Sequence, residues 1–366
     1  MCVILKIRIY SLTANIVLIL PLLFSGCAGK TVERADVSSA QTRPETAVDS
    51  SEDTVSEPES AALNASSGGS AHSSAIQSKA ASSAASSGAP SGAIPPPALP
   101  SAAVVTSTVC PLYRKADATS TLDTQALYNQ PVTVKSKTGS FLYVTVVDGY
   151  TGYIKESNVT NSTASLAGDK HVVVTKTMAE IDWTRPVGFT GTVPPEKVPM
   201  GTELFGKFEN GWFFASLPGG GEGRLNADDI KEIADEKLQF DGDGSKIVAT
   251  ANLFKGTKYL WGGVSVLGID CSGLTYISYR MNGITLPRDA EPQSKEGQKI
   301  SIDEALPGDL MFFSKNTDKV GVSHVGIYIG NGNFIHSSVA NNGYSQSNHI
   351  SETYFAQRLV SINRYY

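Results

Sequence analysis

The strongest constraint on this chain is a single cysteine at the start of a predicted helix. Cys271 follows a glycine-rich turn at 259–263 (YLWGG) and opens the run 271–283. Apolar residues recur along that run at helical spacing, so one face of the helix can pack against a sheet: Leu274, Ile277 and Met281. Cys271 then lies in the first turn, beside backbone N–H groups that have no partner within the helix.

Two histidines follow in short apolar runs that are typical of strands. His324 lies in 322–329 (VSHVGIYI), and His336 lies in 333–338 (NFIHSS). The glycine-rich turn between these runs favours two adjacent antiparallel strands. Because side chains alternate along a strand, the neighbours of His324 face the other way, and the two imidazoles can face one cleft.

A cysteine, a histidine and a polar group that orients the histidine are the parts of a cysteine hydrolase. The thiolate is the reactive form, and two features are expected to lower the pKa of Cys271: the helix N-terminus and a nearby imidazolium. The N–H groups of the first turn can also stabilise the oxyanion on the attacked carbonyl. A single cysteine in an apolar setting is usually structural. The ordered combination of turn, cysteine helix and two histidine strands favours catalysis.

This combination resembles the NlpC family of bacterial cell-wall cysteine peptidases, which have a papain-like fold. The resemblance covers 241–366 and rests on five motifs in the same order: 259–263 (YLWGG), 270–274 (DCSGL), 306–313 (LPGDLMFF), 323–330 (SHVGIYIG) and 334–337 (FIHS). It implies that Cys271 is the nucleophile, that His324 is the general base and acid, and that His336 orients His324. The implied substrates are peptidoglycan stem peptides, cut between γ-D-glutamate and a diamino acid.

The resemblance also implies a substrate-binding and oxyanion set around the nucleophile. Tyr259 lines the oxyanion site, and Asp270 and Ser272 flank the cysteine. Arg288 and Asp289 line the substrate groove, where Arg288 suits a substrate carboxylate and Asp289 can bind an amine. The simpler interpretation of such an Arg-Asp pair is a solvated ion pair in a loop.

The last third of the chain reads as a helical part followed by strands. A short helix is expected at 245–254, and the cysteine helix follows it. Alternating apolar runs then indicate strands: 310–313, 325–329, 333–335 and 359–362. Helices segregated against an antiparallel sheet make an α+β domain, which agrees with the papain-like fold that the resemblance implies.

Two strand-rich segments precede this domain and predict two small all-β barrels. The first, 102–165, ends in a run at 142–154 that resembles a bacterial SH3-like domain. The second, 170–235, resembles a diverged second copy. The expected architecture is therefore multidomain, with two SH3-like barrels followed by an α+β papain-like NlpC catalytic domain.

This domain order resembles a subgroup of the family in which the first SH3-like domain caps the cleft. That subgroup prefers stem peptides with a free N-terminal L-alanine, whose amine is bound by an acidic residue and a tyrosine of the cap. Tyr150 is the candidate tyrosine. Gln130 stands where relatives often carry glutamate, so the sequence identifies no acidic partner.

The N-terminus reads as a targeting segment followed by a tether. Residues 1–27 have a basic start, an apolar stretch and the end LLFSGC, which resembles a bacterial lipoprotein signal and implies lipidation of Cys27. An ordinary secretory signal is the alternative. Residues 28–101 are rich in Ser, Ala and Pro and cannot form a core, which predicts a disordered tether. The expected location is the cell envelope, with a lipid anchor in the membrane.

Charge and cysteine usage weigh against several other classes. The net charge is −5, from 30 basic and 35 acidic residues, without a basic stripe that would suggest nucleic acid. The sequence contains no Cys-x-x-Cys or His-x-x-x-His pair, so neither a metal nor another cofactor is expected. Cys110 is expected to be free and partly buried, because a bridge to Cys271 would block the nucleophile. We expect a monomer.

The leading prediction is a lipid-anchored cysteine endopeptidase that cleaves γ-D-glutamyl–diamino acid bonds in peptidoglycan stem peptides. Two alternatives remain open. One is a non-catalytic cell-wall-binding lipoprotein that uses its SH3-like modules as adhesins. The other is a different cysteine amidase or acyltransferase on the same fold.

Overall fold

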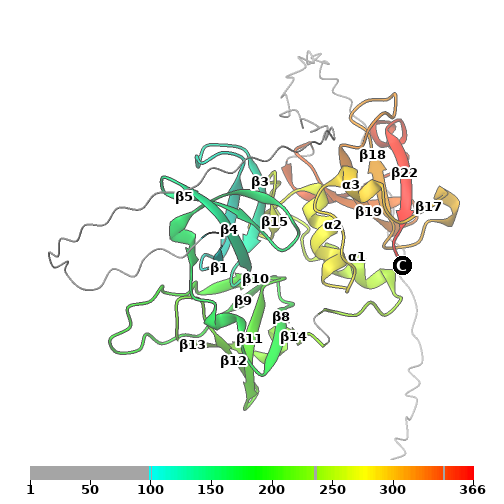
Figure 1. Ribbon diagram of the computed structural model, residues 1–366. Coiled ribbons are helices and arrows are strands. Elements are labelled where there is room, and N and C mark those ends of the chain that lie inside the picture. The colour runs from blue at the N-terminus through cyan, green and yellow to red at the C-terminus, as the bar shows by residue number, and fades with distance from the viewer. Residues whose placement is uncertain (1–98, 100, 235–236, 341–342) are drawn as a thin grey trace, which may run out of the picture. The chain divides into compact units, whose positions relative to one another are not determined.

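The computed structural model describes residues 99, 101–234, 237–340 and 343–366 (Figure 1). The described residues belong to one compact unit. The predictions for the targeting segment 1–27, including Cys27, and for nearly all of the tether lie outside the described residues. In the part of the chain that the structure describes, no helix is long and apolar enough to cross a membrane.

The first β-module is an antiparallel sheet of short strands in the order β3-β2-β6-β5-β4-β1-β7. Burial alternates along β4, β5 and β6, because one face of each strand packs into the core of the module. Strand β1 begins at Ser101, the last residue assigned to the tether. The strands are β1 (Ser101–Val105), β2 (Val109–Tyr113), β3 (Leu122–Leu127), β4 (Pro131–Thr138), β5 (Phe141–Thr145), β6 (Thr151–Lys155) and β7 (Val159–Thr160), with the 3-10 helix η1 (Glu156–Asn158) before β7.

The second β-module has a five-stranded sheet in the order β13-β12-β11-β8-β14, and β9 pairs with β10 separately. Its elements are η2 (Ala164–Leu166), β8 (Lys170–Val174), β9 (Met178–Glu180), β10 (Lys197–Pro199), β11 (Glu203–Glu209), β12 (Trp212–Ser216), β13 (Glu222–Asn226), η3 (Ala227–Asp229) and β14 (Ile230–Glu232). The order β6-β5-β4-β1-β7 of the first module matches this sheet strand for strand, with a 3-10 helix before the last strand in both. The shared strand order supports a common plan, and the origin of the second module as a diverged SH3-like copy stays a prediction.

The turn between β3 and β4 joins the two modules. Tyr128 of the first module is buried in the apolar cluster of the second. The next residue, Asn129, has a φ of 62°, a left-handed conformation that asparagine tolerates better than most residues. Its side-chain amide donates a hydrogen bond to the backbone carbonyl of Glu203 at 3.0 Å. A side chain of one module therefore completes the core of the other.

The C-terminal part is an α+β domain, as predicted. Its antiparallel sheet has the strand order β17-β22-β18-β19-β20-β21. The strands are β17 (Gln298–Ile300), β18 (Leu310–Phe313), β19 (His324–Gly330), β20 (Asn333–Ser337), β21 (Ser345–His349) and β22 (Leu359–Arg364). The helices are α1 (Gly244–Asn252), α2 (Cys271–Arg280), α3 (Ala290–Ser294), α4 (Thr353–Ala356) and the 3-10 helix η4 (Ile302–Glu304). A hairpin of β15 (Val264–Ser265) and β16 (Gly268–Ile269) precedes α2.

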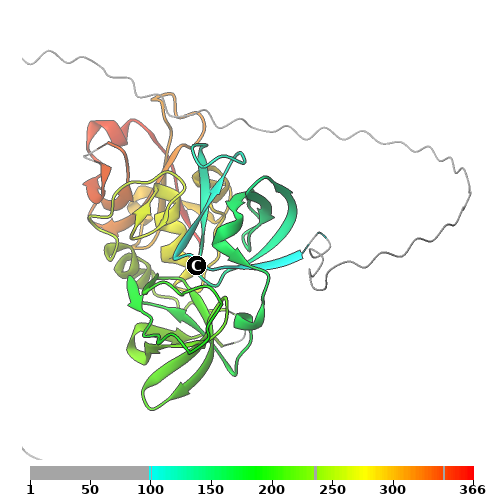
Figure 2. The ribbon, with the colours of Figure 1, turned by 90° about the vertical axis from the view of Figure 1, so that its left-hand side faces the viewer.

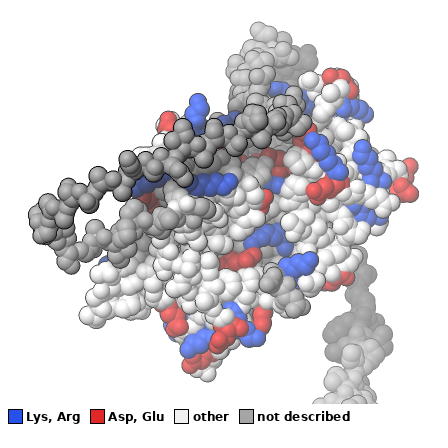
Figure 3. Space-filling model, viewed as in Figure 1, with Lys and Arg blue, Asp and Glu red and all other residues white. Residues whose placement is uncertain are grey.

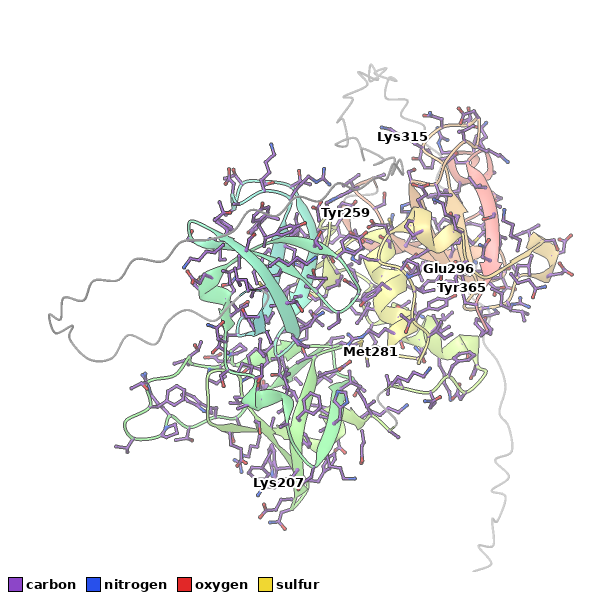
Figure 4. All side chains as sticks on the ribbon, viewed as in Figure 1. Lys207, Tyr259, Met281, Glu296, Lys315 and Tyr365 are labelled. Carbon is purple, nitrogen blue, oxygen red and sulfur yellow. The ribbon has the colours of Figure 1, made fainter. Side chains whose placement is uncertain are left out.

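Helix α2 lies beside the sheet of the α+β domain (Figures 1 and 2), and the apolar residues that the sequence predicts to face the sheet are buried. One apolar cluster joins it to β19 and β20: Leu274, Ile277, Val325, Ile327 and Ile335. Met281, the C-cap residue labelled in Figure 4, belongs to the same cluster. Burial of an aliphatic side chain of this size contributes about 1.5–3 kcal/mol. Packing therefore fixes α2 on the sheet, and with it the position of Cys271.

The other face of the sheet carries an aromatic cluster beneath α4. Phe355 of α4 packs edge-on against Phe334 of β20, with ring centroids 4.9 Å apart. His336 lies against both rings, at 5.0 Å from Phe334 and 5.3 Å from Phe355. Alternation along β20 turns Ile335 toward α2 and His336 toward this cluster. The imidazole of His336 is thus enclosed by apolar rings.

Charged side chains of both signs are interspersed on the face that Figure 3 shows. The arrangement on that face agrees with the modest net charge of −5. A mixed surface of this kind produces no strong field of one sign.

Candidate active site

The side chain of Asp270 holds the start of helix α2. Its carboxylate accepts hydrogen bonds from the backbone N–H of Gly273 at 2.6 Å and from that of Gly262 at 2.7 Å. The first bond caps the helix, and the second ties the glycine-rich turn to it. A Cβ atom on Gly273 would lie 2.1 Å from the carbonyl oxygen of Gly263. This close approach requires glycine, so Cys271 lies in a tightly held first turn.

Arg288 is enclosed behind this cap. Its guanidinium donates to the two carboxylate oxygens of Asp270 at 3.0 and 2.7 Å and to the hydroxyl of Ser272 at 2.9 Å. It also donates to the carbonyl of Gly263 at 3.2 Å and to the hydroxyl of Thr124 in β3 at 3.1 Å. These bonds occupy all five N–H donors of an arginine. The side chain has no donor left for a substrate.

The prediction that Arg288 supports a substrate carboxylate is therefore wrong. Asp270 and Ser272, which the sequence analysis placed in the substrate set, have side chains buried in the same network. A buried guanidinium needs a counter-charge and filled donors, and Asp270 supplies the counter-charge. These side chains hold the start of the helix that carries Cys271. Through Thr124 they also join that helix to the first β-module.

Cys271 is buried, and its pKa differs from the sequence prediction. Burial, followed by the charge of Asp270, raises the pKa of the thiol to about 12. Hydrogen bonds from the backbone N–H groups of Val325 and Ser272, with the charge of Arg288, oppose this rise without cancelling it. The expected lowering by the helix N-terminus and an imidazolium is outweighed, because a buried thiolate loses its hydration. In this state Cys271 is a neutral thiol.

His324 and His336 meet across adjacent strands, as the alternation predicts. Nε2 of His324 lies 2.8 Å from Nδ1 of His336. One of the two backbone N–H groups that reach the Cys271 sulfur belongs to Val325, the residue after His324. Within the described ranges no hydrogen bond joins the thiol to an imidazole directly. Catalytic contacts of this kind often tighten only when substrate is bound.

Burial lowers the pKa of both imidazoles. The pKa of His324 falls well below its usual value, first because of burial and then because of His336. Burial also lowers the pKa of His336, against the raising effects of a hydrogen bond to Asn348 and of the charge on Glu352. Both rings are therefore neutral at pH 7. The site rests as an uncharged thiol and imidazole, and one proton transfer from Cys271 to His324 creates the ion pair.

Asn348 was not predicted from the sequence to belong to the site. Its side-chain oxygen lies 2.8 Å from Nε2 of His336, so the polar chain continues beyond the two histidines. Asn348 belongs to β21, whose sequence SQSNH has no apolar alternation and no β-branched residue. Such a segment carries no strand signal. The signal that could have found it is an amide in a polar run shortly after the second histidine.

The residue after Arg288 lies in a different environment. The carboxylate of Asp289 accepts a hydrogen bond from the hydroxyl of Tyr150 in the first β-module. Burial, followed by the charges of Asp123 and Asp148, raises the pKa of Asp289 to about 6, although part of the side chain is exposed. Tyr150 and Asp289, both predicted to contact substrate, are thus brought together at one edge of the site.

Asp123 and Asp148 are acidic residues of the first module that were not predicted from the sequence to lie at this edge. Gln130, at the position where an acid was sought, uses its side-chain oxygen to accept from the backbone N–H of Leu127 at 2.8 Å. Asp123 lies in β3 and forms an ion pair with Arg114 at 2.6 Å. Its charge is among those that raise the pKa of Asp289. The charge of Asp148 does the same, and the Asp148 side chain accepts a hydrogen bond from the backbone N–H of Tyr150 at 3.1 Å.

Two other predicted residues lie apart from this network. Tyr259 is half-buried on the segment that leads to β15 (Figure 4), and its backbone N–H donates to the carbonyl of Gly343 at 2.7 Å. Its part in an oxyanion site stays a prediction. Cys110 is unpaired and fully buried, more than the partial burial expected, and burial raises its pKa to about 12. Among the described residues no group of His, Cys, Asp and Glu could hold a metal ion.

Known protein families match the first β-module and the α+β domain. The model described as the NlpC/P60 family matches residues 256–364, and the model described as the bacterial dipeptidyl-peptidase Sh3 domain matches 112–159. A γ-D-glutamyl-L-lysine dipeptidyl-peptidase from Bacillus cereus is 33% identical over 232 residues, which cover 59% of this chain and 67% of the relative. A protein of the same name from Bacillus subtilis is 29% identical over 256 residues, covering 66% and 81%. The crystal structure of an NlpC/P60 family protein from Bacillus cereus has a TM-score of 0.66 at 26% identity, and the match covers 72% of this chain and 99% of that one.

Proposed function

This chain belongs to the NlpC/P60 family, and from that premise we propose that it is a cysteine endopeptidase that cleaves the γ-D-glutamyl–diamino acid bond of peptidoglycan stem peptides. The observation that carries the proposal is the contact at 2.8 Å between the imidazoles of His324 and His336, next to the residue that binds the Cys271 sulfur. Two relatives named γ-D-glutamyl-L-lysine dipeptidyl-peptidases support the choice of bond.

The first half of the reaction transfers the γ-glutamyl group to the enzyme. His324 takes the proton of the Cys271 thiol, and the thiolate sulfur attacks the carbonyl carbon of the scissile amide. Backbone N–H groups at the start of α2, with Tyr259 as a further candidate, stabilise the negative oxygen of the tetrahedral intermediate. The intermediate collapses to a thioester while the imidazolium of His324 gives its proton to the departing amine.

The second half releases the product. A water molecule gives a proton to the now neutral His324 and attacks the thioester carbonyl. Collapse of the second tetrahedral intermediate breaks the carbon–sulfur bond, and the sulfur recovers its proton from the imidazolium. His336 keeps the ring of His324 in the orientation that both halves need. Since the site starts neutral, each half of the turnover creates a buried imidazolium at His324 with a negative partner and then removes it.

The edge formed by Tyr150 and Asp289 suits the free amine of an N-terminal L-alanine. The ammonium group can pair with the Asp289 carboxylate, and the negative charge of Asp123 also favours a cation there. A cation at this position also offsets the charges of Asp123 and Asp148, which after burial raise the pKa of Asp289. We therefore propose that the first β-module contributes to the choice of short peptides with a free N-terminus.

We also propose that the enzyme is exported and anchored by a lipid on Cys27. The end LLFSGC of the targeting segment and the Ser-, Ala- and Pro-rich tether at 28–101 support this. Phase partitioning of the wild type and of Cys27→Ser in a detergent extract tests it. Recovery of the mature wild type in the aqueous phase would contradict the anchor.

Cleavage of defined stem peptides tests the proposed function. The full chain is incubated with L-Ala-γ-D-Glu-L-Lys and with the diaminopimelate peptide, and the products are identified by mass spectrometry. We expect L-Ala-γ-D-Glu and a peptide or amino acid that begins with the diamino acid. Wall binding without products from either peptide would favour the non-catalytic alternative, and products from other amide bonds would favour a different amidase.

A further inference from the structure

The polar chain of the active site crosses three neighbouring strands and ends at a glutamate. His324 in β19 contacts His336 in β20, and His336 contacts Asn348 in β21, each at 2.8 Å. In the β20–β21 register Asn348 stands opposite Phe334, two residues from His336, so both side chains leave the sheet on the same face. Beyond β21, the Nδ2 of Asn348 reaches both carboxylate oxygens of Glu352 at 3.1 and 3.0 Å.

The carboxylate of Glu352 determines which way the amide of Asn348 points. An ionised carboxylate only accepts hydrogen bonds, so Asn348 must present its NH₂ group to Glu352. The carbonyl oxygen of Asn348 then faces His336. Glu352 is itself held in place by the backbone N–H of His349, which donates to its carboxylate at 2.9 Å.

The orientation of this amide determines the tautomers of the two imidazoles. Because Asn348 offers an acceptor, Nε2 of His336 carries the proton and its Nδ1 is the acceptor. His324 must then donate from Nε2, which leaves its Nδ1 unprotonated and able to take a proton. We infer that Asn348 and Glu352 are positioning residues that keep His324 in the tautomer required of the general base.

The charges around the chain agree with this assignment. The pKa of Glu352 is lowered, first by the hydrogen bond from the backbone of His349, so its carboxylate is ionised at neutral pH. The imidazoles of His324 and His336 are neutral because their pKa values are lowered, and only a neutral imidazole has two tautomers. His349 is a further titratable group whose charge acts on Glu352, and its ring contacts Ser351 and the carbonyl of Asn331.

This inference rests on the proposed function, because it assigns roles within the same site. Its test therefore has one readout that needs no substrate. In the full chain labelled with ¹⁵N-histidine, two-bond ¹H–¹⁵N correlations report the tautomer of each ring. We expect His324 and His336 to be protonated on Nε2 in the wild type, and Glu352→Ala to give a mixture at both rings. A wild-type His324 protonated on Nδ1 would overturn the inference even if the peptides are cleaved.

The kinetic test uses Glu352→Ala and Glu352→Gln on the stem peptide. We expect Glu352→Ala to lower kcat about tenfold with KM unchanged, which is less than the loss from removing a general base itself. Glu352→Gln keeps an acceptor for Asn348 and should stay within about threefold of the wild type. The matched control is Gln357→Ala, an exposed C-cap residue of α4, which should retain full kcat. A wild-type kcat in Glu352→Ala, or equal losses in Ala and Gln, would contradict the tautomer role.

A double variant separates orientation from a purely structural effect. In Asn348→Asp both side-chain oxygens accept, so an acceptor faces His336 whether or not Glu352 is present. The pair Asn348→Asp/Glu352→Ala should therefore recover most of the activity that Glu352→Ala loses. Absence of recovery, with an unchanged Tm, would overturn the inference. If the wild type cleaves no stem peptide, the proposed function fails, and the NMR tautomers still decide the inference.

Discussion

The nucleophile side and the histidine side of the site are built in opposite ways. On the nucleophile side, the buried ion pair of Arg288 and Asp270 and its hydrogen bonds occupy every donor of the guanidinium. On the histidine side, neutral groups follow one another across three strands from His324 to Asn348, and the chain ends at the exposed Glu352. The first side is a closed network, and the second is a series with one end in water.

The difference indicates how each side should respond to substitution. In a closed ionic network, removing one partner leaves a buried charge without compensation. The substitution therefore lowers the free energy of unfolding. In a series, each member acts on the reaction through the member before it. A substitution therefore lowers kcat, and the decrease is smaller for residues farther from the reacting atoms. Substitutions on each side test this contrast, and both sides depend on Cys271.

The largest effect is expected for Cys271→Ala, which removes the attacking sulfur. Hydrolysis of the stem peptide should fall to the background rate, because no other group forms the thioester. The fold should persist, since alanine is tolerated in the first turn of a helix. Cys110→Ala is the matched control and should keep its activity. Turnover by Cys271→Ala at the wild-type rate would refute the mechanism.

The histidine series should give graded losses in kcat. His324→Ala removes the general base and should lower kcat by about 10²- to 10⁴-fold. His336→Ala should cost less, because His336 acts only by orienting His324. His171→Ala is the control, since its ring contacts Glu203 in the second β-module and lies outside the series. A greater loss in His336→Ala than in His324→Ala would reverse the order of the series and contradict the assignment.

A substitution in the closed network should lower the free energy of unfolding. Arg288→Met leaves the Asp270 carboxylate buried without its partner and should lower the free energy of unfolding by about 3–5 kcal/mol, measured by denaturant titration. Lys295→Met, which breaks the exposed pair with Glu291, should cost no more than about 1 kcal/mol. Comparable stability of both variants would show that the Arg288 network does not hold the helix start.

The smallest effect is expected at the edge where the first module meets the site. Because the pKa of Asp289 is raised to about 6, its carboxylate is charged above pH 6 and neutral below it. The KM for a peptide with a free N-terminal amine should therefore rise as the pH falls through 6, and the KM for its N-acetylated form should not. Tyr150→Phe should raise KM severalfold for the free-amine peptide only. If KM depended on pH in the same way for both peptides, Asp289 would not bind the amine.

Local patterns were enough to predict much of this protein. The helical spacing after Cys271 and the alternation around His324 describe single elements, and the structure contains both as expected. The α+β class of the catalytic part also follows from such patterns, because each element needs one apolar face to pack. The contact between His324 and His336 could be predicted because both lie on adjacent strands joined by a short turn.

Only the tertiary structure determined the properties of the site that depend on burial and on contacts between residues far apart in the sequence. Arg288 reads as a groove residue in the sequence, but packing against Thr124, 164 positions away, encloses it and fills its donors. The pKa of Cys271 rises for the same reason, since hydration is lost through residues that no local pattern connects. Asn348 and Asp123 join the site from strands whose sequences carry no catalytic signal. Sequence periodicity determined which groups point to one side of an element, and the packing of the elements determined which of them lose water and which remain free to react.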